Sequence, residues 1–566
     1  MPTFDNVLEE AGVFGIYQKT IFFLIYLTSA LFSYLYVGFV FLAITPDHWC
    51  RSPGVTELSN KCNWSPEVEK NYTIPLSRND RSSYSQCERY DIDWNASSVS
   101  CDNPLPFVQN SSRTLPLTGC QDGWVFENGS SPSIVTEFEL VCADAWKLDL
   151  SQACLNLGFL IGTIFMGYAA DVFGRKVCFL FAILVTSVSG LCVAFSQNYL
   201  WFAIFRTLQG LFSRGGWLCG YVLITEIVGL EYRRTAGILN QMWFSIGMMI
   251  LPAVAYFIQD WRNLQLAATI PNFLFLSYYW LIPESPRWML TRRKNAEAMK
   301  VLQTMAKRNG KTLTSSSKSI TVEECNKAVG SPSFIDLVRT PQMRKQTLIL
   351  MFNWFASAMI YQGLIMRLGI LGGNIYLDFF ISGAVEIPAS VIIVLVIERI
   401  GRRLPFAAGG LVAGGSCLIA AFIPKDFLWL KTAIACLGRL GITVTFEMVC
   451  FVNTELYPTF LRNFAVSVCS ALCDAGGIVA PFILYRLAAI WIEMPLVVFG
   501  IIGLVAGGLV LLLPESKGMV LPDTIADVEN LRVQKKKIAK TQYQHVALHS
   551  STRKKEPAAV KINFKS

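Results

Sequence analysis

Three acidic side chains stand away from the ends of long apolar stretches of the sequence: Glu386, Glu447 and Asp474. A charged side chain at the centre of a lipid bilayer costs at least about 2.5–3.5 kcal/mol, so each one is a functional hypothesis. A carboxylate that is held in a partly dehydrated cavity attracts a positively charged ligand, because its charge is otherwise uncompensated. These three residues are therefore candidate contacts for a cation.

Asp474 belongs to a small and polar helical face. Positions 467, 470, 474, 477 and 481 follow one another at intervals of three or four residues, which places them on one side of a helix. The residues there are Ser, Ser, Asp, Gly and Pro. Such a face is expected where a helix lines a cavity. The alternative for Asp474 is a buried ion pair with a neighbouring basic residue such as Arg439. Glu447 is near Arg439 in the sequence, and its alternative is a structural or gating role.

Aromatic rings are the second kind of group that could hold a cation. The face of a ring attracts a desolvated ammonium ion by about 2 kcal/mol or more. Trp354 and Tyr361 are seven residues apart and share a helical face, with Gln362 beside them. Most of the 14 Trp, 19 Tyr and 38 Phe residues must pack in the core or face lipid. Further ring candidates in the middle of apolar stretches are Tyr36, Trp217, Phe244 and Phe446.

Basic residues also lie within the apolar stretches, and Arg214 and Arg439 are candidates for gating or charge balance. Two roles are open for Arg214. It could face Asp474 across a cavity as a gate, or it could pair structurally with Glu226 or a backbone carbonyl group.

Membrane-spanning helices are the elements that must position these residues. Of the 566 residues, 53% are hydrophobic and only 16% are charged, against about 25% in ordinary globular chains. A spanning helix needs about 20 apolar residues. Twelve stretches meet this requirement: 22–43, 148–170, 177–195, 199–227, 236–257, 264–282, 347–369, 374–397, 405–423, 428–452, 464–487 and 494–513.

Several classes of function are excluded by composition and by motifs. The net charge of +9 is divided among loops, which fits membrane topology better than nucleic-acid binding. None of the three His residues lies in an apolar stretch, so a histidine-based metal or catalytic centre within the membrane is not expected. The chain also lacks nucleotide-binding, zinc-protease and serine-hydrolase motifs. We therefore expect neither an enzyme nor a cofactor.

The segment 44–147 differs from the rest of the chain in composition. It is polar, and six cysteines favour a disulfide-bonded outer loop with 15 possible pairings. These are Cys50, Cys62, Cys87, Cys101, Cys120 and Cys142. Its Asn-x-Ser/Thr sequons predict N-glycosylation, and they are Asn63, Asn71, Asn95, Asn110 and Asn128. The same loop is a surface through which a homo-oligomer could form.

Charge predicts the orientation in the membrane. The segment 44–147 has 8 Lys and Arg against 14 Asp and Glu, whereas 283–346 has 13 against 5 and 514–566 has 11 against 5. Basic loops stay in the cytoplasm, so we expect both termini there and the basic tail near lipid headgroups. The expected divisions are a cytoplasmic N-terminus 1–21, a first helix 22–43, an extracellular loop 44–147, helices two to six 148–282, a cytoplasmic loop 283–346, helices seven to twelve 347–513 and a cytoplasmic tail 514–566.

Matching marks in the two halves indicate a duplicated six-helix unit. They are Asp171 and Arg175 after the second stretch, Glu398 and Arg402 after the eighth, Glu226 and Arg233 after the fourth, Glu455 and Arg462 after the tenth, and Pro-Glu-Ser at 283–285 and 514–516. The offset is 227 residues from position 171 to 398, 229 from 226 to 455, and 231 from 284 to 515. Parallel halves of this kind are a transporter architecture. We expect the charged marks to form a gating and charge network, in which Asp and Arg of a loop pair with helix ends of the same half.

The segment GYAADVFGRK at 167–176 is similar to the loop signature of the major facilitator superfamily. Further segments resemble the polyspecific organic ion transporters of that superfamily: TPDH at 45–48, CNWSP at 62–66, VTEFELVC at 135–142, PESPRW at 283–288 and ELYPTFLRN at 455–463. DLVRTPQMRK at 336–345 and CDAGG at 473–477 look like the organic cation branch. The resemblance covers residues 1–530.

This resemblance implies twelve helices in two pseudo-symmetric halves and a carrier of small organic cations, including monoamines, in the plasma membrane. In this family the acid matching Asp474 is held to attract the substrate's charge, and Glu386 matches a second acid of the cavity. With no nucleotide motif and no membrane-embedded His as a proton carrier, we expect electrogenic, Na⁺-independent uniport by alternating access. A zwitterion or organic anion carrier on the same scaffold is the alternative, and a receptor or adhesion glycoprotein is the rival from another class.

Overall fold

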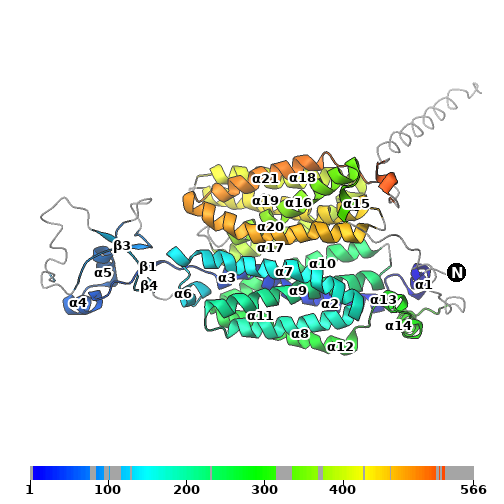
Figure 1. Cartoon of the computed structure of the whole chain (residues 1–566), viewed down its shortest axis with the longest axis horizontal. Coiled ribbons are helices and arrows are strands. Elements are labelled where there is room, and N and C mark those ends of the chain that lie inside the picture. Colours follow the sequence, from blue (N-terminus) through cyan, green and yellow to red (C-terminus); the bar gives the residue numbers. More distant parts are fainter. Residues whose placement is uncertain are drawn as a thin grey trace, which may run out of the picture. The chain divides into compact units, whose positions relative to one another are not determined.

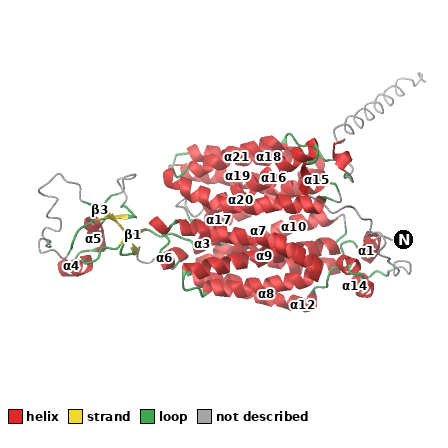
Figure 2. Cartoon of the chain, in the orientation of Figure 1, coloured by secondary structure: helices red, strands yellow, loops and turns green. Residues whose placement is uncertain are grey.

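The computed structural model of the chain is built mainly of α-helices (Figure 1). It describes residues 4–76, 84–94, 101, 116–127, 131–229, 232–313, 334–367, 374–424, 427–458, 461–517, 522 and 525–529. The sequons at Asn95, Asn110 and Asn128 lie outside these ranges. Figure 2 shows helices in nearly all of the described chain, and the strands are confined to the segment between the first two long helices.

The chain divides into two compact units. One contains residues 1–323, 362–387 and 477–495, and the other contains residues 324–361, 388–476 and 496–566. The boundary between them runs through three long helices: α16 (Pro341–Arg367), α17 (Ile375–Ile400) and α20 (Arg462–Ile490).

Long helices correspond to the twelve apolar stretches. Those before residue 283 are α2 (Ile16–Val37) with α3 (Phe39–Leu42), α7 (Trp146–Phe173), α8 (Arg175–Ala194), α9 (Tyr199–Ile227), α10 (Arg233–Phe257), and α11 (Trp261–Leu274) with the 3₁₀ turn Phe275–Ser277 and α12 (Tyr278–Leu281). Those after residue 340 are α16, α17, α18 (Arg403–Phe422), α19 (Leu428–Leu456), α20 and α21 (Met494–Val510). The twelve-helix prediction is therefore confirmed, and several helices are longer than their apolar stretch.

Nine helices in the described ranges are long and apolar enough to span a membrane, and α21 is a shorter apolar helix. The predicted fourth and sixth spans are not among these helices, and the sequence of each gives a physical reason. The charged residues Arg206, Arg214 and Glu226 make α9 less apolar than its neighbours. The sixth span contains Pro271, which removes a backbone donor, and it breaks into α11, a 3₁₀ turn and α12.

Shorter elements lie outside the spans. They are α1 (Phe4–Ala11), β1 (His48–Cys50), α4 (Val55–Cys62), α5 (Pro66–Thr73), β2 (Glu88–Tyr90), β3 (Leu117–Gly119), β4 (Trp124–Phe126), α6 (Ile134–Phe138), the 3₁₀ turn Cys142–Asp144, α13 (Pro286–Thr291), α14 (Asn295–Arg308) and α15 (Phe334–Val338). β1 pairs with β4 and β2 pairs with β3, both antiparallel.

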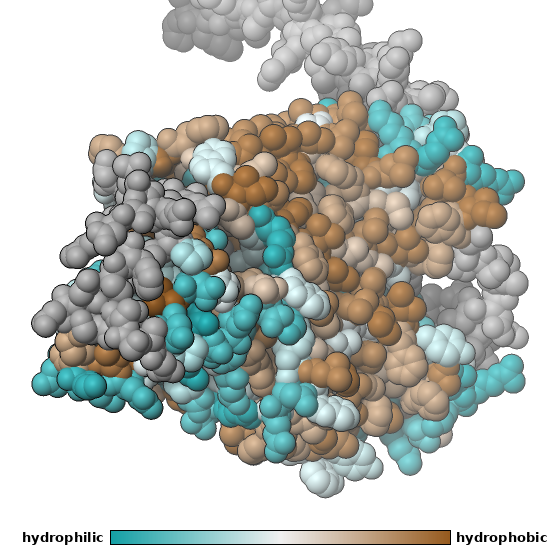
Figure 3. Space-filling view, turned by 60° about the vertical axis from the view of Figure 1, so that its left-hand side comes forward, coloured by the Kyte–Doolittle hydropathy of each residue, from teal (hydrophilic) through white to brown (hydrophobic). Residues whose placement is uncertain are grey.

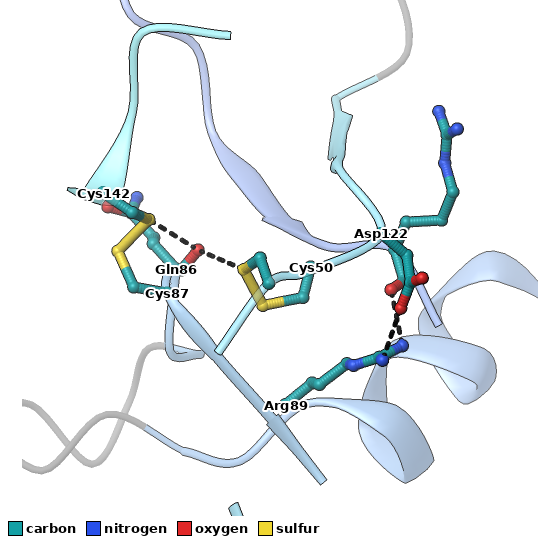
Figure 4. The surroundings of a disulfide bond; sticks show 8 residues. Cys50, Gln86, Cys87, Arg89, Asp122 and Cys142 are labelled. Carbon is teal, nitrogen blue, oxygen red and sulfur yellow. Dashed lines mark hydrogen bonds and ion pairs between the residues drawn. A yellow bond between two sulfur atoms is a disulfide. The ribbon is translucent and has the colours of Figure 1, made fainter. Parts of the chain in front are cut away.

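All six cysteines of the segment 44–147 form disulfides, which resolves the pairing that the sequence left open. The bonds are Cys50–Cys120, Cys62–Cys101 and Cys87–Cys142. The carbonyl oxygen of Gln86 lies 3.8 Å from the Cys120 sulfur and 3.4 Å from the Cys142 sulfur, and Arg89 binds Asp122 at 2.6 Å nearby (Figure 4). Since β1 and β2 are short, these covalent links are needed to hold the loop together.

The helices present an apolar outer surface, as a lipid-facing protein requires. On the face drawn in Figure 3, hydrophobic residues cover much of the helical surface and hydrophilic ones gather toward its ends. Exposed large apolar side chains include Phe257 (82%), Trp280 (80%) and Tyr168 (74%). A water-soluble protein rarely exposes so many, and this surface agrees with a multi-pass membrane protein.

Candidate functional site

A cluster of aromatic rings lies in the first unit. Tyr36 and Phe244 have ring centres 5.9 Å apart, and Phe32 lies 6.0 Å from Tyr36 and 6.1 Å from Trp217. These rings come from α2, α9 and α10. Three predicted ring candidates are thus brought together, and Phe32 and Phe159 join them although sequence reasoning did not select them. They were hard to identify because aromatic side chains in a membrane span usually pack in the apolar core or face lipid.

Glu386 of α17 is completely buried and contacts α10 next to a ring of this cluster. Its carboxylate accepts a hydrogen bond of 2.7 Å from the Ser245 hydroxyl group, and Ser245 follows Phe244 directly. A hydroxyl donor stabilises a carboxylate without itself bringing a positive charge. The first unit therefore holds a buried acid and aromatic rings on adjacent positions, which are the two kinds of group that recognise a cation.

The second unit contains a matching arrangement. Phe446 lies 5.8 Å from Trp354 and 5.8 Å from Tyr361, measured between ring centres. The guanidinium group of Arg439 stacks 3.8 Å from the Tyr361 ring centre and donates a 3.0 Å hydrogen bond to the Tyr361 carbonyl group. Glu447, which follows Phe446, accepts a 2.5 Å hydrogen bond from the Ser390 hydroxyl group. The predicted residues of α16 and α19 are thus in contact.

Asp474 is buried on α20, with 5% of its surface exposed. Its neighbour Cys473 belongs to the same hydrophobic cluster as Trp354, against which Phe446 packs. The candidate acid of α20 therefore adjoins the apolar core of the second unit. On α16, the Nε1 atom of Trp354 and the Oε1 atom of Gln362 are buried without a hydrogen-bond partner in the described residues, so both are open to a ligand or water.

The two halves of the repeat fold their charged marks in the same way. Arg175 binds Glu226 at 3.1 Å and Asp171 at 2.9 Å, and Arg402 binds Glu455 at 3.2 Å. The predicted ion pairs therefore join the loop after one helix to the end of another in each half. They brace each half internally.

A second shared feature is a glutamate that caps a helix in each half. The Glu284 carboxylate accepts the backbone N–H groups of Arg175 (3.0 Å) and Lys176 (3.1 Å) at the start of α8. Glu515 accepts those of Arg402 (2.8 Å) and Arg403 (3.1 Å) at the start of α18. A negative charge is favourable at a helix N-terminus.

Glycine precedes each capped helix for a geometric reason. Gly174 and Gly401 have φ angles of +108° and +104°, in the region that favours glycine. A Cβ atom would lie 2.4 Å from the Glu284 carboxylate at Gly174 and 2.9 Å from the Glu515 carboxylate at Gly401. Both glycines of the repeated motif are thus required by the caps.

Other members of the expected charge network have different contacts. Arg214 stacks on Trp217, with 4.9 Å between its guanidinium carbon and the ring centre. Arg233 donates to the Thr225 carbonyl group at 2.8 Å, and Arg462 donates to the Tyr457 carbonyl group at 3.4 Å. The side chain of Glu398 lies outside the described part.

An ion pair that sequence reasoning missed joins α7 and α20. Asp149 is buried and binds Arg486, which is half exposed, at 3.0 Å. Asn156, two turns further along α7, donates a 2.7 Å hydrogen bond to the Gly477 carbonyl group. Asp149 is the second residue of a predicted span, so its burial could have been suspected, but its partner is 337 positions away.

The segment 96–524 matches the family of sugar (and other) transporters. The chain is 56% identical over 548 residues to solute carrier family 22 member 2 of Mus musculus, covering 96% of the chain and 99% of that protein. Member 2 of Homo sapiens is 54% identical with the same coverage, and member 3 of Rattus norvegicus is 54% identical over 94% of the chain and 96% of that protein. The expected subtype was organic cation transporter subtype 3, the extraneuronal monoamine transporter, and these identities do not settle it, because member 2 is as similar as member 3 or more so.

Solved structures of bacterial transporters share the fold. The inward open xylose transporter XylE from E. coli superposes with a TM-score of 0.59 at 17% identity, covering 91% of the chain and 99% of that chain. The same symporter, described as a member of the major facilitator superfamily and bound to 6-bromo-6-deoxy-D-glucose, gives a TM-score of 0.57 at 17% identity with the same coverage. At this identity the likeness concerns the fold alone.

Proposed function

Since the chain belongs to solute carrier family 22, within the major facilitator superfamily, we propose that it carries organic cations across the plasma membrane. The family makes it a multi-pass membrane transporter of small molecules and not an enzyme. The proposed substrates are monoamines, quaternary ammonium compounds and cationic drugs.

One observation carries this proposal. Each unit contains a buried carboxylate close to an aromatic ring of its cluster. Glu386 accepts a hydrogen bond from Ser245, which follows Phe244, and Glu447 itself follows Phe446. A carboxylate supplies attraction for any cation, and rings accept cations of varied shape. Such a combination suits a polyspecific site, and Asp474 adds a third buried acid.

The proposed topology follows the charge distribution. We place the disulfide-linked segment 44–147 outside the cell. Asn63 and Asn71, which lie in the described part of this segment, are proposed glycosylation sites. Disulfides persist in oxidising compartments, which supports this side. Both termini and the basic segment 283–346 are placed in the cytoplasm.

The proposed energetics are those of an electrogenic uniporter. One positive charge crossing about 100 mV is worth about 2.3 kcal/mol. At 1.36 kcal/mol per factor of ten, this drives accumulation on the order of 50-fold inside a negative cell. Rocking of the two halves around a midplane site supplies alternating access, and no coupling ion is needed.

Uptake of a labelled quaternary ammonium compound into oocytes tests the proposal. Asp474→Asn should reduce uptake at least about tenfold relative to its surface expression, because the substituted amide no longer attracts the cation. Asp378→Asn is the matched control, since Asp378 is a half-buried acid in the first turn of α17 and has no assigned role. Equal loss of uptake and surface expression in Asp474→Asn would assign Asp474 to structure, and no uptake by the unsubstituted protein would contradict cation transport.

A zwitterionic substrate is the second candidate. Arg439 stacks on Tyr361 within the ring cluster of the second unit, so a cationic group lies close to candidate cation-binding rings. A substrate with one ammonium and one carboxylate group could use both. Competition between a labelled zwitterion and a quaternary ammonium compound, measured in Arg439→Gln, separates the two candidates because only zwitterion uptake should depend on the guanidinium group.

A further inference from the structure

A cavity of about 60 Å³ lies in the first unit, lined by α2, α3, α8, α9 and α11. Phe32 and Trp217 of the ring cluster form part of its lining. A water molecule needs about 10–15 Å³ of such space, so the cavity has room for a few small molecules or ions. Its lining is unusually polar for the interior of a membrane protein. The polar residues include Thr186, Arg206, Gln209, Ser213, Gln265 and Thr269.

Arg206 is the only basic residue of this lining, and it is almost completely buried, with 1% of its surface exposed. Its guanidinium carbon lies 5.0 Å from the ring centre of Phe39 and 6.0 Å from that of Phe202. Ring faces attract the charge, but the N–H groups of a guanidinium lie in its own plane and still need acceptors. The Nε and Nη2 atoms of Arg206 have no hydrogen-bond partner in the described chain.

The helices that line the cavity offer no carboxylate that could neutralise this charge. The neighbouring helix α7 carries Asp149 and Asp171, but Asp149 binds Arg486 and Asp171 binds Arg175. The sequences of α2, α3, α8 and α11 contain no Asp or Glu. The one acid of α9 is Glu226, and it binds Arg175. A guanidinium group does not lose its proton in proteins, so the positive charge persists in a low-dielectric interior and requires a counter-charge from elsewhere.

Other polar atoms at the cavity complete the arrangement. The hydroxyl oxygen of Thr186 on α8 and the Oε1 atom of Gln209 on α9 are buried and unpartnered among the described residues. The Thr186 hydroxyl group and the two free N–H groups of Arg206 are donors from different helices, and donors of this kind stabilise a negative ion. The small volume excludes a large organic ion.

From this cavity, its buried guanidinium group and the missing carboxylate, we propose that the first unit binds a small inorganic monovalent anion such as chloride, with Arg206 and Thr186 as ligands. The anion acts as the counter-ion of Arg206 and stabilises the packing of α2, α8, α9 and α11. The cavity shares Phe32 and Trp217 with the ring cluster of the first unit, but none of the acids proposed to bind the transported cation lines it. The anion ligands Arg206 and Thr186 are not among the residues proposed to bind the cation.

Thermal unfolding of the purified full-length protein tests this site, with sodium chloride replaced by sodium gluconate at constant ionic strength. The unsubstituted protein should show a saturable rise of Tm on the order of 5 °C with chloride, because a ligand of the folded state raises its stability. Bromide should act like chloride. Arg206→Gln should abolish the rise, and Arg287→Gln, which removes an exposed charge on α13, should keep it.

Thr186→Val keeps the test decisive if Arg206→Gln does not fold. It removes one donor but leaves the charge, so the chloride concentration for half of the Tm rise should increase severalfold. Equal Tm values of the unsubstituted protein in chloride and gluconate would overturn the proposal. So would a chloride effect that persists in Arg206→Gln or is unchanged in Thr186→Val, or a rise produced by acetate but not by chloride.

Discussion

Removal of the Glu284 side chain should destabilise the first unit strongly. The carboxylate accepts the N–H groups of Arg175 at 3.0 Å, Lys176 at 3.1 Å and Ser285 at 2.9 Å. A hydrogen bond to a charged group contributes about 1.5–3 kcal/mol. Glu284 is only partly buried, so water replaces some of this, and we expect Glu284→Ala to cost about 2–3 kcal/mol.

This cost should appear as a fall in Tm of about 3–4 °C, at about 1.3 °C per kcal/mol for a unit of this size. The assay is thermal unfolding of the purified protein. Glu284→Gln keeps an acceptor and should lose about half as much. Glu515→Ala should behave like Glu284→Ala, because Glu515 caps α18 in the same manner.

The matched control is Glu297→Ala, whose side chain is 59% exposed and lies 4.0 Å from Lys294. We expect little change in Tm for this variant. The KM for a transported cation should also stay constant in all these proteins, since each cap lies within one half and none of its residues is proposed to contact substrate. Equal Tm values for Glu284→Ala and Glu297→Ala would show that the Glu284 cap does not stabilise the first unit.

Three further predictions follow from the loop and from the missed ion pair. Glycosidase treatment should increase the gel mobility of the protein made in animal cells, and unchanged mobility would place the segment 44–147 on the other side of the membrane. Cys50→Ser with Cys120→Ser should destabilise the loop by about 2–5 kcal/mol and reduce surface delivery, as measured by surface biotinylation; undiminished delivery would contradict this. In a double-mutant cycle on Tm, Asp149→Asn and Arg486→Gln should show coupling of about 0.5–1 kcal/mol, reduced by the exposure of Arg486, whereas strict additivity would refute the pair.

Much of the fold could be predicted from the sequence because it depends on local composition and on repetition. The predicted fourth span, 199–227, has the same bounds as α9. The repeated marks include both members of the Arg175–Glu226 and Arg402–Glu455 pairs, because a duplicated unit folds the same spacing twice, but the sequence did not assign these partners to each other. A broken sixth span was not predicted, although Pro271 was a visible signal.

The candidate site was less predictable, because it depends on contacts between distant residues. The three disulfides could not be selected from 15 pairings by spacing alone. The stacking of the Arg214 guanidinium group on Trp217, one turn away on the same helix, was not among the contacts expected for it. Ser245 and Ser390 gave no signal in the sequence, since a serine in a span usually bonds to its own helix.

Substrate-evoked current in voltage-clamped oocytes tests the central claim most directly. A quaternary ammonium compound should evoke an inward current at negative potential that persists when external Na⁺ is removed and when pH is varied. The net flux should reverse when the voltage is reversed, because the substrate carries the only charge that moves. A current that vanishes without Na⁺, or an electroneutral flux tied to a proton gradient, would contradict cation uniport in favour of coupled exchange.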